Sequence, residues 1–134
     1  MIKRALALIA LLFGTAVTAT ADESWNSQHG WIIYEAEDRG AAILSFTNHY
    51  GIQSVLIIPG LAGNYDHRGI HDAYWIGRGA GYCEAVMEFP GYSGTQWGRA
   101  EVIFDGPSFP TGFTLQFGEC MGPLTMGLRA ELPR

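Results

Sequence analysis

Residues 124–132, Leu-Thr-Met-Gly-Leu-Arg-Ala-Glu-Leu, carry an apolar side chain at most alternate positions. Successive side chains of a β-strand point to opposite faces, so a period of two is typical of a strand with one buried face. The same alternation occurs in three segments that precede it along the chain, at 83–89, 97–104 and 113–117. Because the pattern persists through four successive segments, it predicts antiparallel sheet.

The alternation also predicts which side chains are buried. In the first of these segments Cys83, Ala85, Met87 and Phe89 should face inward. In the next segment Trp97, Arg99 and Glu101 fall on the outward face.

The first half of the chain contains three more predicted strands, rich in aromatic and β-branched residues, at 31–36, 42–47 and 53–58. Residues 60–81 include six glycines, and only 73–76 look extended, so we expect a long irregular loop with one short strand. No stretch of the predicted domain has helical periodicity. The fold class is therefore all-β, an antiparallel meander of seven or eight strands that forms either a small barrel or a two-sheet sandwich.

The N-terminus resembles an export leader. Lys3 and Arg4 precede an apolar run at 5–13, and Ala19 and Ala21 provide the small residues that a signal peptidase requires. We expect residues 1–21 to be a signal peptide and 22–134 a single domain, secreted or periplasmic. The apolar run is shorter than the roughly 20 residues that span a bilayer, so we expect no stable membrane anchor.

Charge and cysteine content restrict the partners of residues 22–134. Six arginines stand against thirteen acidic residues, a net charge of −7 with histidine neutral. This excess of acid disfavours nucleic-acid binding and would attract a basic partner. In an exported chain without a Cys-x-x-Cys motif, the pair Cys83 and Cys120 predicts a structural disulfide rather than a redox-active thiol.

The 60–81 loop is the expected recognition segment because it joins glycine flexibility to polar and aromatic side chains. Its candidate binding residues are Tyr65, His71, Tyr74 and Trp75, and Trp97 joins them from the outward face of its strand. Such aromatics can equally well plug the ends of a barrel. On this basis the first hypothesis is an exported, soluble binding module for a protein or glycan partner in the cell envelope or outside the cell.

Two other hypotheses compete with the binding module. Asp66, His67, His71 and Asp72 could ligate a metal ion in a small hydrolase, or they could belong to a solvated, turn-rich loop. A barrel could also carry an apolar ligand. Glu35 and Glu37 lie two apart on a predicted strand and should share a face, but no complete catalytic set is visible. We therefore assign no catalytic residue and no cofactor, and favour a protein that is not an enzyme.

The combination of an export leader, a small acidic β-domain and a single disulfide is similar in outline to the periplasmic inhibitors of lysozyme. The similarity in sequence is confined to Tyr82 and Glu84 around Cys83 and assigns no family.

Overall fold

The structure is a computed structural model that describes residues 23–134, and every regular element in this part of the chain is a β-strand. The expected signal peptide and its cleavage site before Asp22 lie outside the described residues. The strands are β1 (Ser24–Ser27), β2 (Gly30–Asp38), β3 (Ala41–Thr47), β4 (Gln53–Ile58), β5 (Ile70–Gly77), β6 (Met87–Phe89), β7 (Tyr92–Gly94), β8 (Trp97–Phe104), β9 (Phe113–Phe117) and β10 (Met126–Ala130). Within residues 23–134 no helix is long and apolar enough to cross a membrane.

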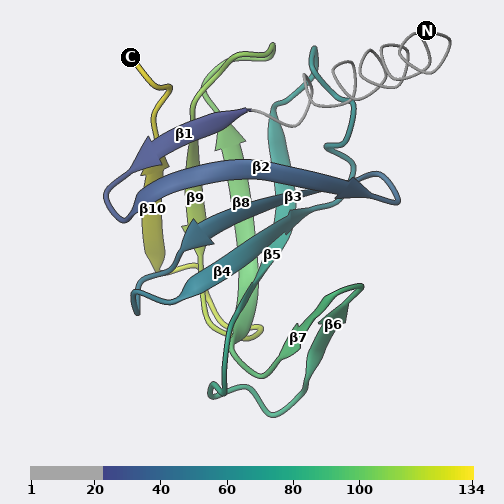
Figure 1. The fold of residues 1–134 in the computed structure, drawn as a ribbon, viewed down its shortest axis with the longest axis vertical. Helices are drawn as coiled ribbons and strands as arrows, with labels where there is room; N and C mark the ends of the chain where they lie inside the picture. Colours follow the sequence, from purple (N-terminus) through teal and green to yellow (C-terminus); the bar gives the residue numbers. More distant parts are fainter. Residues whose placement is uncertain (1–22) are drawn as a thin grey trace, which may run out of the picture.

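Eight of the strands form one antiparallel sheet in the order β1-β2-β3-β4-β5-β8-β9-β10 (Figure 1). Its two edge strands approach each other, and Asn26 and Glu131 exchange two backbone hydrogen bonds of 2.8 Å there. The sheet is therefore a nearly closed, barrel-like meander, which confirms the all-β prediction and selects the barrel over the sandwich.

Large side chains fill the inside of the barrel. Its fully buried aromatic residues are Trp25, Tyr34, Phe46, Trp75, Phe113 and Phe117. The alternation within each strand directs these side chains to one face, and closure of the sheet removes that face from water.

A buried ion pair closes the barrel end where the β4–β5 loop lies. The Arg68 side chain is 1% exposed, and its guanidinium donates two hydrogen bonds to the Glu23 carboxylate, at 2.6 and 3.0 Å. The guanidinium carbon also lies 5.2–5.5 Å from the ring centroids of Tyr65, Phe104 and Phe109. Burial raises the pKa of the Glu23 carboxyl, while the hydrogen bonds and charge of Arg68 act in the opposite direction.

The remaining strands, β6 and β7, form a separate hairpin outside the barrel (Figure 1). Its apolar side chains pack on the outer face of the sheet, where Ile57, Ile76 and Trp97 are buried against Met87 and Phe89. This second apolar cluster also contains the predicted disulfide, Cys83–Cys120, which is present.

Three local predictions differ from the structure. The short strand expected at 73–76 within the 60–81 loop is the eight-residue β5, which pairs with β4 and β8. The strand expected at 83–89 is regular only over β6 and belongs to the hairpin, and Ala85 is exposed rather than inward. Strand β1 had no counterpart in the sequence analysis.

Candidate functional site

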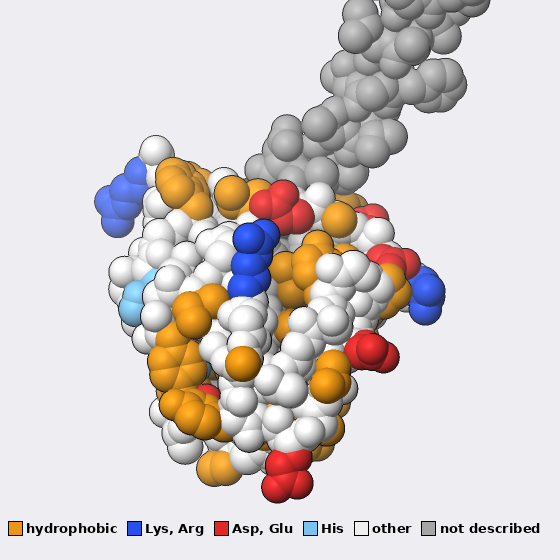
Figure 2. Space-filling model, turned by 60° about the horizontal axis from the view of Figure 1, so that its bottom comes forward, with side chains coloured by type: hydrophobic (Ala, Val, Ile, Leu, Met, Phe, Trp, Pro, Cys, Tyr) orange, Lys and Arg blue, Asp and Glu red, His pale blue; other side chains and the backbone are white. Residues whose placement is uncertain are grey.

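A groove lies where the β6–β7 hairpin stops covering the outer face of the barrel. Its volume is about 420 Å³. We call it the hairpin groove, and it is lined by Glu35, Ser45, Gln53, Ser54, Val55, Ile76, Gly77, Arg78, Gly91, Tyr92 and Ser93. Figure 2 turns the hairpin end of the molecule forward and shows hydrophobic side chains gathered on both sides of a basic one.

The floor of the groove is a row of outward side chains on adjacent strands. Ser45 on β3 pairs with Val55 on β4, and Val55 pairs with Ile76 on β5. Paired residues in an antiparallel sheet project from the same face. The row therefore runs from a hydroxyl, at the open side, to an isoleucine beneath the hairpin.

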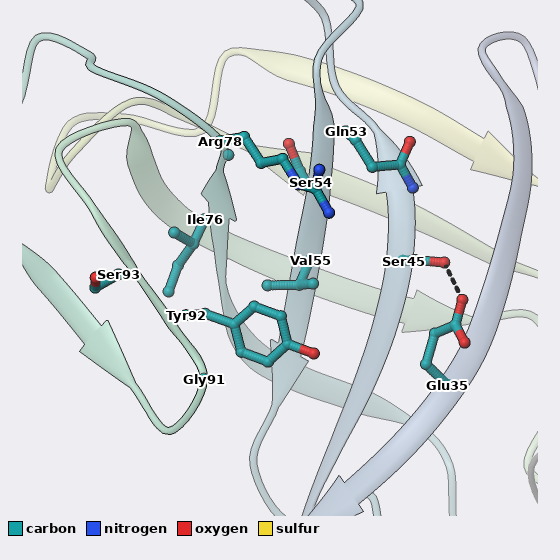
Figure 3. Close-up of a pocket in the computed structure, with 11 residues that line it drawn as sticks. Glu35, Ser45, Gln53, Ser54, Val55, Ile76, Arg78, Gly91, Tyr92 and Ser93 are labelled. Carbon is teal, nitrogen blue, oxygen red and sulfur yellow. Dashed lines mark hydrogen bonds between the residues drawn. The ribbon is translucent and has the colours of Figure 1, made fainter.

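A β-bulge brings Glu35 to the open side of the floor. The register of β2 on β3 shifts between Tyr34 and Ala36, which leaves Glu35 without a paired residue. The Ser45 hydroxyl donates a 2.7 Å hydrogen bond to the Glu35 carboxylate (Figure 3). This hydrogen bond occupies one of the two carboxylate oxygens of Glu35 and holds the carboxylate against the groove floor.

The hairpin supplies the opposite wall through Tyr92 and Ser93. In Figure 3 the ring of Tyr92 lies over Val55, with its hydroxyl directed toward the Ser45 side of the groove. The ring also belongs to the second apolar cluster, so its inner edge packs against protein while the rest borders the groove. An aromatic ring held in this way can stack on a flat ligand surface.

Arg78 stands at the end of the groove, directly after β5, and is exposed. Its backbone N–H donates to the Gln53 carbonyl at 3.3 Å, and the preceding Gly77 N–H donates to the Gln96 carbonyl at 2.8 Å. A β-carbon on Gly77 would lie 2.1 Å from the Gln96 side-chain oxygen, so a larger residue here would displace the Gln96 amide from its hydrogen bond with Asn48. These contacts fix the backbone from which the Arg78 side chain extends.

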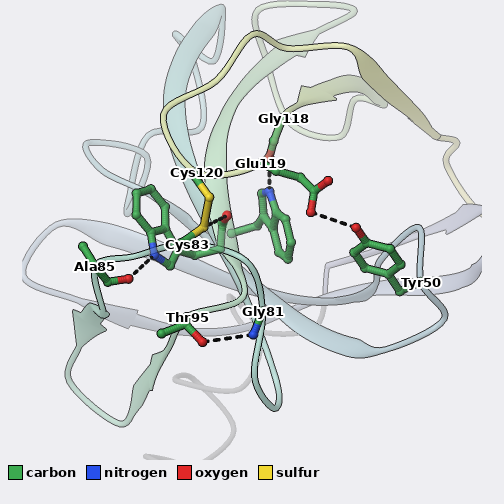
Figure 4. Close-up of a disulfide and its surroundings, with 10 residues drawn as sticks. Tyr50, Gly81, Cys83, Ala85, Thr95, Gly118, Glu119 and Cys120 are labelled. Atoms are coloured by element: carbon green, nitrogen blue, oxygen red, sulfur yellow. Dashed lines mark hydrogen bonds between the residues drawn. A yellow bond between two sulfur atoms is a disulfide. The ribbon is translucent and has the colours of Figure 1, made fainter.

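The hairpin wall is anchored at its base rather than free to swing (Figure 4). The disulfide ties the segment before β6 to the chain after β9. The Trp97 indole donates to the Ala85 carbonyl at 2.9 Å, and the Gly81 N–H donates to the Thr95 hydroxyl at 2.9 Å. A wall held at these points presents a groove that is formed before any ligand arrives.

Two predicted binding residues, Trp75 and Trp97, have core positions. Trp75 is fully buried inside the barrel, where its indole donates to the Gly118 carbonyl at 2.8 Å. Trp97 does lie on the outward face of β8, but the hairpin covers it and leaves it 6% exposed. Neither ring is available to a partner while the fold is intact.

The other three predicted binding residues are half-buried and lie apart from the hairpin groove. Tyr65 packs edge-on against Phe109, with ring centroids 5.9 Å apart, in the aromatic closure around Arg68. His71 faces the barrel interior near Phe104, at 6.3 Å. Tyr74 faces outward on β5, paired with Ile57 and Arg99.

The four candidate metal ligands are not assembled into a site. Asp66 and His67 lie in the loop before β5, while His71 and Asp72 are consecutive on β5 and therefore point to opposite faces. Among residues 23–134 no three His, Cys, Asp or Glu side chains are grouped closely enough to hold a metal ion.

The expectation that Glu35 and Glu37 share a face is wrong. The bulge shifts the side-chain alternation by one residue between them. Glu37 therefore follows Tyr34, whose hydroxyl donates to it at 2.6 Å, while Glu35 turns to the outer face.

A second group of exposed aromatics surrounds the barrel end near the disulfide. Tyr82 is 77% exposed, and its ring centroid lies 6.4 Å from that of Tyr50. The Tyr50 hydroxyl donates to Glu119 at 2.8 Å, which raises the pKa of Tyr50 to about 12. The depression beside these rings has a volume of about 300 Å³, and the described residues that line it include no charged side chain.

The residues that line the groove were missed by sequence reasoning because they come from separate segments. Arg78 lies inside the loop that we singled out, but neither its charge nor its glycine neighbours distinguish it from a solvated residue. Tyr92 falls between the strands predicted at 83–89 and 97–104, in a segment to which the sequence assigned no element. The one available signal was the count of aromatics, which exceeds what the predicted inward faces can hold.

Comparison of the chain with protein-family models, with curated proteins and with solved structures finds no match. The geometry of the hairpin groove is therefore the basis on which we assign a function.

Proposed function

We propose that the protein is an exported binding module that holds a segment of a glycan in the hairpin groove. The observation that carries the proposal is the composition of this groove, an aromatic ring and an apolar floor bordered by hydroxyl, amide, carboxylate and guanidinium groups. Export is proposed from the leader-like N-terminus, and the disulfide is consistent with an oxidising compartment.

The size of the groove favours a glycan segment over a protein surface. About 420 Å³ falls within the range of small-molecule sites, roughly 300–1,000 Å³. A stable protein interface instead covers about 800 Å² on each partner and is centred on well-packed apolar anchors.

The chemistry of the lining also suits a saccharide. Sugar hydroxyls both donate and accept hydrogen bonds, and Gln53, Ser93 and Glu35 offer both kinds of partner. The less polar face of a sugar ring can lie on the ring of Tyr92. The lining contains one carboxylate and no imidazole or thiol, which supports binding without turnover.

The proposal is tested by NMR titration of ¹⁵N-labelled exported protein with a panel of neutral and acidic di- and trisaccharides. A ligand should shift the backbone amides of Ser45, Val55 and Tyr92. Tyr92→Ala should weaken binding by about tenfold, a loss of about 1.4 kcal/mol. Ser45→Ala, which leaves the hairpin packing intact, should also weaken binding.

Tyr82→Ala is the matched control because it removes an equally large but more exposed tyrosine outside the groove. It should leave affinity unchanged. Shifts confined to the surface around Tyr50 and Tyr82 would overturn the site. An envelope protein captured equally well by the parent and by Tyr92→Ala would identify a protein partner instead of a glycan.

A further inference from the structure

We infer that the glycan segment carries a carboxylate, as a uronic acid does, and that Arg78 is the residue that selects it. This inference rests on the proposed function, since it concerns the ligand of the same groove. It goes further by assigning a charge to the ligand and a specificity role to one side chain.

Arg78 is one of three arginines among residues 23–134, with Arg99 and Arg134, that have no carboxylate within salt-bridge distance, and of these three it alone lines the hairpin groove. Within residues 23–134, the side chains of Arg39, Arg68 and Arg129 each lie within salt-bridge distance of at least one carboxylate. The Arg78 guanidinium has no carboxylate within that distance and makes no hydrogen bond to residues 23–134, whereas the Arg99 guanidinium donates to the Gly122 carbonyl at 3.0 Å. In a chain with thirteen acidic residues, an unmatched guanidinium at the end of a groove is available to an anion.

The position of Glu35 gives the ligand a direction. Figure 3 shows Arg78 and Glu35 at different ends of the groove, with Val55 and Ser45 in the floor between them and the ring of Tyr92 to one side. A carboxylate near Glu35 would meet like charge, whereas the same carboxylate near Arg78 would form a charge-assisted hydrogen bond. The hydroxyls at the other end of the sugar would then donate to the Glu35 oxygen that Ser45 leaves free.

Because the protein is acidic, a contact between Arg78 and a ligand carboxylate would contribute to specificity and not to long-range attraction. Residues 22–134 carry six arginines and thirteen acidic residues, a net charge of −7 that repels anions in general, so a carboxylate-bearing ligand must gain its affinity at short range. The planar guanidinium suits this because it can donate two parallel hydrogen bonds to a carboxylate. A neutral sugar of the same shape would leave it without a partner.

The test compares digalacturonic acid with the neutral galactose disaccharide of the same linkage, by NMR titration and calorimetry of the exported protein. The parent should bind the acidic disaccharide about tenfold more tightly, which corresponds to about 1.4 kcal/mol. Arg78→Gln should bring the two affinities together. Arg134→Gln, which removes the same charge at the exposed C-terminus away from the groove, should keep the preference.

The possible outcomes distinguish a failure of the role of Arg78 from a failure of the glycan groove. If both disaccharides shift the groove amides with equal affinity, or if Arg78→Gln keeps the preference, the role of Arg78 is overturned while the glycan groove stands. If neither disaccharide shifts the groove amides at millimolar concentration, this inference fails. The proposed function fails with it only if the wider saccharide panel gives no groove shifts either.

Discussion

At the scale of single residues, the Glu23–Arg68 pair shows how one buried contact organises a barrel end. The two side chains are 45 positions apart in the sequence and almost fully buried. A buried ion pair contributes little net stability compared with apolar packing, because both charges lose their hydration. The pair instead favours one arrangement of this barrel end, because any arrangement that leaves Glu23 or Arg68 buried without its partner has a higher free energy.

We expect Arg68→Met to destabilise the protein by about 3–5 kcal/mol, because it leaves the Glu23 carboxylate buried without a partner. The double variant Glu23→Leu/Arg68→Met should recover most of this loss. Urea denaturation measures both. A single variant as stable as the parent would mean that Glu23 moves into solvent, and that the pair does not organise this barrel end.

At the scale of elements, apolar alternation correctly predicts the strands that have one buried face and one face in water. It does not predict strands whose two faces are both covered by protein. Only residues 73–76 of β5 were predicted to be extended, because both faces of this strand carry apolar residues, Trp75 inside the barrel and Ile76 beneath the hairpin. The alternation at 83–89 is real, but its apolar face packs on the outside of the barrel. An alternating pattern identifies a buried face and not the surface that buries it.

The hairpin groove is even harder to predict from local sequence patterns than the strands are. Its lining comes from β2, β3, β4, the end of β5 and the hairpin, and only the register of the sheet brings these segments together. The bulge at Glu35 adds a one-residue shift that no local pattern reveals. The disulfide was predictable, since the two cysteines of the chain have one possible intramolecular pairing.

Removing the disulfide should loosen the hairpin more than the barrel. We expect Cys83→Ser/Cys120→Ser to lower the free energy of unfolding by about 2–4 kcal/mol, because closing this 37-residue separation restricts the unfolded chain. Hydrogen exchange should accelerate first in β6 and β7, while amides of Leu44 and Leu115 in the barrel stay protected.

Saccharide affinity should fall in this variant together with the protection of the hairpin. Uniform loss of protection in the hairpin and the barrel would contradict an independently anchored wall. Unchanged protection in the hairpin would show that packing on Trp97 alone is sufficient to hold it.

At the scale of the whole molecule, both barrel ends are closed by side chains, but with opposite chemistry. The end near Arg68 uses an ion pair. The other end uses His49, whose ring contacts those of Tyr50, Trp75 and Phe117 at centroid distances of 4.0–5.7 Å. Neither ring nitrogen of His49 has a hydrogen-bond partner among residues 23–134, and both are buried. Such a site accommodates a neutral imidazole and resists a charged one.

This asymmetry predicts how global stability depends on pH. Burial lowers the pKa of His49 from its ordinary value of 6.5. As pH falls below 6.5, the unfolded chain therefore binds a proton that the folded chain does not, and the folded state loses stability until the lowered pKa is reached. The change in unfolding free energy with pH that one such group causes cannot exceed about 1.4 kcal/mol per pH unit.

The raised pKa of Glu23 has the opposite effect on stability above pH 4.5, because there the folded carboxyl keeps a proton that the unfolded chain releases.

Urea denaturation of the parent and of His49→Leu, at intervals from pH 7.5 to 5, isolates the contribution of His49. Leucine fills the same apolar site without titrating, so the difference in unfolding free energy between the two proteins should shift in favour of the variant as pH falls through 6.5. The Glu23 contribution is common to both proteins and cancels in this difference. A difference that stays constant across the range would show that the His49 ring reaches water when protonated, and that this end of the barrel opens at low pH.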